Sequence, residues 1–214
     1  YLLVGLLHFY ASLRIQIVVF IASLVGSWAL MHFVEVPGIG AANLEVNKNL
    51  AAWLDNYLLE GHLWASSKTW DPEGILSTLP AVATGLAGLF AGRYLQGSAK
   101  ASVLFAAGAI ALAVGTIWGW YFPINKALWT SSYVLVAAGW DLLLLAVLQA
   151  TVHSAIFADR YWKPVLIFGM NPMLVFFFSG IIPRVLGMIK IGDEGLTSWI
   201  YSQRIEPLFA DKMN

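Results

Sequence analysis

The chain has 214 residues, no net formal charge at pH 7 and no cysteine. Hydrophobic residues make up 59% of it and charged residues 11%, whereas soluble domains carry about 25% charged residues. The mean hydropathy is +0.74. This composition predicts an integral membrane protein with the lipid bilayer as a partner. It gives no reason to expect a nucleic-acid partner, a disulfide framework or a thiolate metal site.

The first 34 residues contain two apolar segments. Residues 1–13 are shorter than the roughly 20 residues of a full span, so they predict the end of a helix that starts earlier. Because Tyr1 already lies in an apolar run, we expect the chain to be part of a longer protein. Residues 15–34 predict the first full span. His8 and His32 fall in these segments, where packing is the commoner role of a lone histidine.

Residues 35–73 form the long polar stretch of the chain, and they contain one amphipathic helix. Its expected N-cap is Asn49 and its expected stop is Gly61. Apolar residues recur there at the spacing of one helix face: Leu50, Trp53, Leu54, Tyr57 and Leu58. The opposite face is polar: Asp55, Asn56 and Glu60. Such a helix lies in the membrane interface or covers the bundle as a lid.

Four further apolar stretches follow, at residues 74–95, 101–119, 129–151 and 164–182. Pro80 should kink the first of them, and residues 169–172 should break the last. Small residues recur along two of the stretches and predict close helix packing: Ala81, Gly85, Gly88 and Gly92, then Ala107, Ala111, Gly115 and Gly119. The expected fold is therefore an all-α, polytopic transmembrane bundle in a single domain, residues 1–214. It has about five full spans, a partial first helix and a polar tail at 183–214.

Two carboxylates open the span at 74–95. Asp71 and Glu73 stand two residues apart, with Pro72 stiffening the backbone between them. Carboxylates at the boundary between water and hydrocarbon are costly unless solvated or paired, so both are candidates for a binding site. The alternative is a solvated helix start, where acidic side chains offset the helix dipole.

Asp141 lies near the middle of the span at 129–151. A carboxylate in mid-membrane is expensive, which favours a functional role, although a hydrogen-bonded Asp inside the bundle is the alternative. We expect it to face the bundle interior, with a partner on the broken helix near Asn171.

Basic residues occupy alternate connections and set the expected orientation. They are Arg14, Arg93 with Lys100, and Arg160 with Lys163, all assigned to the cytoplasm by the positive-inside bias. The loop at 35–73, the connection at 125–126 and the tail at 183–214 then lie outside. This orientation places the Asp71–Glu73 pair on the same outer face as Asn125 and Lys126.

Two sequence motifs carry a family resemblance. The first is residues 70–80 (WDPEGILSTLP) with Gly88, Ala91 and Gly92, and the second is residues 123–134 (PINKALWTSSYV). A shorter third motif is residues 169–172 (GMNP). In this order and spacing they resemble the heparan-α-glucosaminide N-acetyltransferase family, and most of all its bacterial NagX-like members, over residues 15–182.

The resemblance implies a membrane-bound enzyme in a bacterial inner membrane that transfers an acetyl group from acetyl-CoA to an amino sugar such as glucosamine, without a metal. The family's proposed catalytic histidine belongs to N-terminal helices that precede this chain. None of His8, His32, His62 and His153 is its counterpart, and the family's final helix is also missing. Asp141 lies outside the family pattern. The candidate substrate-binding residues are Asp71, Glu73, Asn125, Lys126, Ser131 and Asn171.

Two other classes of function stay open. An amino-sugar permease linked to N-acetylglucosamine uptake would give Asp141 and the break at Asn171 more weight than the outer cluster. A non-catalytic membrane scaffold would use its polar residues only for packing. A second copy of the chain is a candidate partner in each case.

Overall fold

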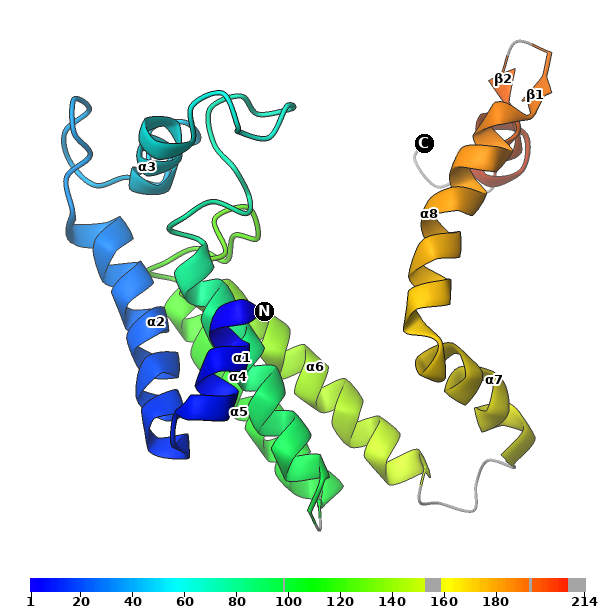
Figure 1. The fold of residues 1–214 in the computed structure, drawn as a ribbon, viewed down its shortest axis with the longest axis horizontal. Helices are drawn as coiled ribbons and strands as arrows, with labels where there is room; N and C mark the ends of the chain where they lie inside the picture. Colours follow the sequence, from blue (N-terminus) through cyan, green and yellow to red (C-terminus); the bar gives the residue numbers. More distant parts are fainter. Residues whose placement is uncertain (98, 153–158, 193, 208–214) are drawn as a thin grey trace. The chain divides into compact units, whose positions relative to one another are not determined.

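The computed structural model describes residues 1–97, 99–152, 159–192 and 194–207 (Figure 1). Its contacts divide the chain into two compact units, residues 1–153 (unit 1) and 154–214 (unit 2), and each is considered by itself. Helices make up 70% of the structure, in line with the predicted helical class. A short hairpin of two strands in unit 2 is the departure from an all-α fold.

Unit 1 is built from helices that were mostly visible in the hydropathy pattern. The predicted segments 15–34, 101–119 and 129–151 agree with three observed helices to within two residues at each end. Helix α4 packs against α1, α2 and α6, and α5 packs along α6. The helices of unit 1 are α1 (Leu2–Tyr10), α2 (Leu13–Phe33), α3 (Leu50–Leu59), α4 (Thr78–Leu95), α5 (Ala101–Gly119) and α6 (Ser131–Val152).

The structure has three to four helices that are long and apolar enough to span a membrane, and about five full spans are not confirmed. The three single helices are α2, α5 and residues 131–151 of α6. The fourth is a pair of helices in unit 2 bent by 88°, if the pair counts as one span. Helix α4 is absent from this set in the described part of the chain, because glycines, threonines and Arg93 dilute its apolar residues.

The start of α4 differs from the prediction. The helix begins at Thr78 and not at Gly74, because residues 72–77 form consecutive turns. Pro80 therefore lies in the first turn, where a missing N–H leaves no helix hydrogen bond unmade. The kink expected at Pro80 has no cause at this position, and α4 runs without a break to Leu95.

Helices α5 and α6 approach each other until their backbones touch. A Cβ added at Gly108 would lie 2.9 Å from the carbonyl oxygen of Gly139, and one added at Gly139 would lie 2.8 Å from the backbone nitrogen of Leu112. A Cβ at Gly115 would lie 2.9 Å from the backbone nitrogen of Val136. Glycine is therefore required at these positions by the helix contact.

Helix α3 forms as predicted, but its buried face is different. The Asn49 side chain caps it by accepting a hydrogen bond from the Ala52 N–H at 2.9 Å. Asp55, expected on the solvent face, is buried together with Ala51 and Ala52, whereas Tyr57 and Leu58 are exposed. Small side chains let α3 pack closely here, and the Asp55 carboxylate meets backbone donors from a distant loop. The core beneath it joins four parts of unit 1: Met31, Ala51, Leu76 and Phe122.

Unit 2 contains the predicted helix break. Helix α7 ends at Met170 and α8 begins at Pro172, with Asn171 between them. Helix α8 continues through Pro183, so the segment expected to be polar tail is helical at its start. The elements of unit 2 are α7 (Asp159–Met170), α8 (Pro172–Met188), β1 (Lys190–Ile191), β2 (Glu194–Gly195), α9 (Leu196–Ile200) and the π-helix η1 (Tyr201–Ile205).

Candidate functional site

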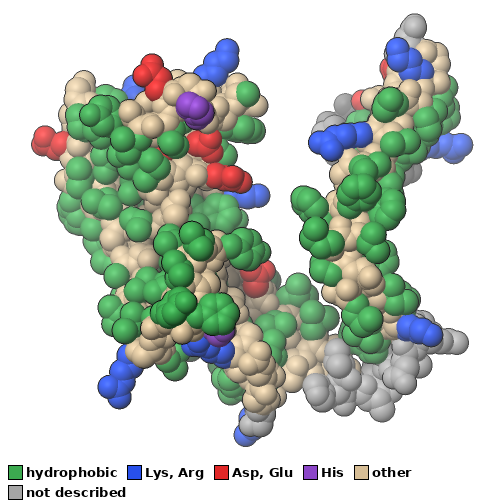
Figure 2. Space-filling view, viewed as in Figure 1, with side chains coloured by type: hydrophobic (Ala, Val, Ile, Leu, Met, Phe, Trp, Pro, Cys, Tyr) green, Lys and Arg blue, Asp and Glu red, His purple; other side chains and the backbone are tan. Residues whose placement is uncertain are grey.

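The loops before α4 and α6 meet at one end of unit 1. The indole Nε1 of Trp129, in the loop before α6, donates a hydrogen bond to Oγ1 of Thr84 in α4 at 3.0 Å. This bond ties the second loop to the helix that follows the first. Figure 2 shows acidic side chains at this end of unit 1, near α3, with basic side chains among them, and further basic side chains at the opposite end of the visible face. The two motifs that carried the family resemblance therefore converge in space.

A small pocket lies where the motifs meet. Its volume is about 210 Å³, and Glu73 and Trp129 contribute its one carboxylate and its one aromatic ring. The Glu73 side chain is exposed, and its carboxylate makes no hydrogen bond or ion pair with the residues that the structure describes. The remaining lining residues are Pro72, Ser77, Thr78 and Ala81. A free carboxylate beside an aromatic ring suits a ligand that combines a cationic or hydroxyl group with a ring face.

Asp71 has a different role from Glu73. Its Oδ2 accepts a hydrogen bond from the Trp64 N–H at 3.0 Å, and its Oδ1 accepts one from the Glu73 N–H at 2.9 Å. The Gly74 N–H also donates to the Asp71 carbonyl oxygen at 3.0 Å, which closes a turn. Both carboxylate oxygens are thus used to hold the loop, and Asp71 does not line the pocket.

Asp55 is the residue that the sequence reasoning missed. It is only 1% exposed, and its Oδ1 and Oδ2 accept hydrogen bonds from the backbone N–H groups of Ile75 (3.0 Å) and Asp71 (3.3 Å). Burial raises the pKa of this carboxyl above its ordinary value, against the opposing effect of the two hydrogen bonds. Its partners lie 16 and 20 residues away, so no local pattern marked it.

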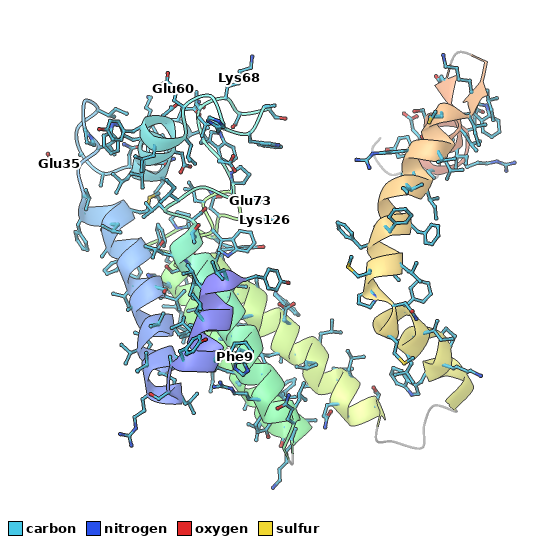
Figure 3. The ribbon with its side chains drawn as sticks, viewed as in Figure 1. Phe9, Glu35, Glu60, Lys68, Glu73 and Lys126 are labelled. Carbon is cyan, nitrogen blue, oxygen red and sulfur yellow. The ribbon has the colours of Figure 1, made fainter. Side chains whose placement is uncertain are left out.

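Asn125 and Lys126 lie in the loop before α6, and Asn125 shapes that loop. Its Oδ1 accepts hydrogen bonds from the backbone N–H groups of Ala127 (2.8 Å) and Leu128 (3.2 Å). Lys126 is exposed at the same end of unit 1 as Glu73 (Figure 3). Across the described residues, no hydrogen bond or ion pair joins Asp71 or Glu73 to either of them, and a site shared by the two loops stays a prediction.

Ser131 is fully buried at the start of α6. Its hydroxyl donates to the Leu24 carbonyl oxygen at 2.6 Å and so ties α6 to α2. Next to it, Ser132 Oγ donates to the Phe122 carbonyl oxygen at 2.6 Å, and Thr130 Oγ1 lies 3.1 Å from Ser132 Oγ. In this arrangement Ser131 holds helices together and does not line the pocket.

Asp141 is exposed on unit 1 and lines a groove of about 390 Å³ between α4 and α6, together with Thr84 and Gly88. No described residue makes a hydrogen bond or ion pair with it. Asn171, in unit 2, donates from Nδ2 to the Ile167 carbonyl oxygen at 2.8 Å. The expected pairing between Asp141 and the helix break at Asn171 involves one residue of each unit, and it stays a prediction.

The histidines are dispersed through the described part of the chain. His32 stacks on Trp28, with ring centroids 5.8 Å apart, in the packing role expected for it. His8 Nδ1 lies 3.0 Å from an Nη2 donor of Arg93, and His62 Nδ1 lies 3.2 Å from the Glu60 carbonyl oxygen. His153 lies outside the described residues. Among the residues searched, no group of three or more side chains could hold a metal ion.

Comparison with known proteins adds no relative: no protein-family model matches the chain, and no curated protein matches it significantly. The pocket and the two motifs that form it are therefore the features that bear on function.

Proposed function

We propose that the protein is a membrane-bound N-acetyltransferase that moves an acetyl group from acetyl-CoA to an amino sugar such as glucosamine. The observation that carries this proposal is the pocket shared by Glu73 and Trp129, one from each of the two motifs. A free carboxylate binds an ammonium group, and an indole ring packs against the face of a sugar. Both features suit a small amino sugar. The location that we propose, from the resemblance, is a bacterial inner membrane.

The reaction needs a neutral amine that attacks the thioester carbonyl. A base removes the ammonium proton, the new N–C bond forms, the C–S bond breaks, and the thiol of coenzyme A leaves with a proton. In our proposal Glu73 binds the ammonium before deprotonation, and Trp129 orients the ring. Lys126, at the same end of unit 1, is the candidate cation for an anionic group of the substrates (Figure 3). No residue of this chain is assigned as the base.

The test uses the complete gene product in lipid nanodiscs with radiolabelled acetyl-CoA and glucosamine. We expect labelled N-acetylglucosamine from the wild type and a loss of at least about tenfold in Glu73→Gln, because the neutral amide no longer attracts the ammonium. Glu60→Gln is the matched control, since Glu60 is an exposed acid at the end of α3 (Figure 3). Wild-type protein that binds acetyl-CoA but forms no acetylated sugar would refute the proposal.

An amino-sugar permease is the second candidate. Two observations favour it: the 88° break at Asn171, and the Asp141 carboxylate, which lines a groove and pairs with no described residue. Broken helices and intramembrane carboxylates are typical of carriers. Sugar flux into proteoliposomes without acetyl-CoA, abolished by Asp141→Asn, would select the carrier. Neither flux nor acetylation would select the scaffold.

A further inference from the structure

The loop that carries Glu73 is hydrogen-bonded to one buried side chain of α3. Asp55 lies on α3, and its two carboxylate oxygens bind the backbone N–H groups of Asp71 and Ile75. These residues are the second before and the second after Glu73. The backbone of Glu73 is therefore fixed on both sides by the same carboxylate.

The fit between Asp55 and this loop is close. A Cβ added at Gly74 would lie 2.6 Å or less from all three atoms of the Asp55 carboxyl group. Gly74 is itself buried, and the Glu73 N–H is bound by Asp71 Oδ1. The turn thus has two anchors, Asp55 beneath it and Asp71 within it, and its position leaves the Glu73 side chain exposed at the pocket.

We infer that Asp55 is a positioning residue for Glu73, which it holds at the pocket that Trp129 also lines by binding the backbone on either side. The inference rests on the proposed function for the identity of the ligand, but the anchoring itself does not. Asp55 touches no ligand. It acts by fixing the turn, so that the carboxylate of Glu73 is in place before a substrate arrives.

The chemistry explains why an aspartate is needed. Two backbone N–H groups require two acceptors, and a carboxylate supplies both. Asparagine at position 55 offers one acceptor and turns an NH₂ donor toward the other N–H. Alanine offers none and leaves both donors without a protein partner. We therefore expect a graded effect, with the wild type above Asp55→Asn and Asp55→Ala lowest.

The first measurement is amide hydrogen exchange, which needs no ligand. In Asp55→Ala the amides of Asp71 and Ile75 should exchange at least about tenfold faster than in the wild type, while those of α5 and α6 stay protected. Asp55→Asn should fall between the two. Glu60→Ala, at an exposed acid on the end of the same helix, should leave exchange at residues 71–75 unchanged.

The second measurement separates positioning from folding. Glucosamine and glucose differ by one amine, so the ratio of their dissociation constants reports how well Glu73 meets the ammonium. We expect Asp55→Ala to lower this preference by about as much as Glu73→Gln, roughly tenfold, while the double variant is no worse than Glu73→Gln alone. A residue with a merely structural role would weaken both sugars equally.

The outcomes distinguish the two proposals. Unchanged exchange at Asp71 and Ile75 in Asp55→Ala overturns the positioning role, whether or not sugars bind. Faster exchange with an intact glucosamine preference also overturns it, because the turn then moves without consequence for Glu73. Wild-type protein with no preference for glucosamine, but with faster exchange in Asp55→Ala, removes the proposed substrate and leaves the anchoring of the Glu73 turn supported.

Discussion

The indole N–H of Trp129 donates to the hydroxyl oxygen of Thr84 at 3.0 Å, and this bond fixes the ring that forms one wall of the Glu73 pocket. Thr84 in turn donates to the Pro80 carbonyl oxygen at 3.2 Å, so the ring is tied to the first turns of α4. Trp129 also has a positive φ of 51°, a conformation that is uncommon for residues other than glycine. The hydrogen bond to Thr84 therefore holds the N–H edge of the ring against α4.

Replacing Thr84 by valine should remove the hydrogen bond that orients the Trp129 ring. The indole N–H loses its acceptor, which costs about 1 kcal/mol of unfolding free energy, and sugar affinity should fall because the ring no longer keeps one orientation. Thr84→Ser, which keeps the hydroxyl, is the control. Thermal unfolding and glucosamine binding measure the two effects. Equal affinities in the valine and serine variants would show that the hydrogen bond does not orient the ring.

Gly74→Ala should destabilise unit 1. The new Cβ would overlap the Asp55 carboxyl group, so the turn or α3 must shift, at a cost of about 1–3 kcal/mol. Gly26→Ala in α2 is a suitable control, because nothing lies within 4 Å of the added atom and alanine favours a helix. Detergent-titrated unfolding compares the two variants. The prediction fails if Gly74→Ala is as stable as Gly26→Ala.

Asp71 and Glu73 should separate in their effects, although they stand two residues apart. Asp71→Asn keeps one acceptor of two, so it should lower unfolding free energy by about 1–2 kcal/mol and reduce acetyl transfer through the displaced turn. Glu73→Gln should reduce transfer strongly without changing the unfolding midpoint, since its carboxylate binds no described residue. Matching thermal shifts in the two variants would contradict this division.

Asp55 should make stability depend on pH in a defined direction. Burial raises the pKa of its carboxyl in the folded protein above the ordinary value of 3.8, so the folded state binds the proton more tightly than the unfolded chain does. The stability contributed by this proton is fully present below pH 3.8 and is lost as the pH rises through the folded-state pKa. As the pH is lowered from 7 to 4, the unfolding midpoint of the wild type should therefore rise relative to that of Asp55→Asn. A constant difference would contradict the prediction.

Asp141→Asn should leave acetyl transfer within about twofold of the wild type, because Asp141 lies in the groove between α4 and α6 and not in the Glu73 pocket. Asp141→Leu tests the same position without any polar group, and it should lower stability if a partner is stranded. Loss of transfer in a well-folded Asp141→Asn protein would instead favour the permease.

Hydropathy and capping predicted much of the fold. Asn49 signalled the start of α3, and uninterrupted apolar runs located α2, α5 and α6. These signals succeed because each depends on residues within one helix. The start of α4 escaped prediction because Asp55 binds the backbone of Asp71 and Ile75 in the turns that precede the helix. About five full spans are not confirmed, because glycines, threonines and Arg93 dilute the apolar residues of α4.

The candidate site was only partly visible. Sequence order could place Glu73 near the loop of Asn125 by sidedness alone, but it could not tell a free carboxylate from one bound to backbone, as in Asp71. The distinction depends on turn geometry. Nor could periodicity show that Asp55 faces inward, since the donors that it meets belong to another loop.

The glycine contact between α5 and α6 bears on how the protein is made. Where the backbones of Gly108 and Gly139 touch, no acyl chain can enter between the two helices. The eleven residues from Trp120 to Thr130 connect them, so the pair can enter the membrane as one helical hairpin. We therefore expect alanine at Gly139 to slow membrane integration and to increase degradation during biogenesis, because the added Cβ would force the two helices apart.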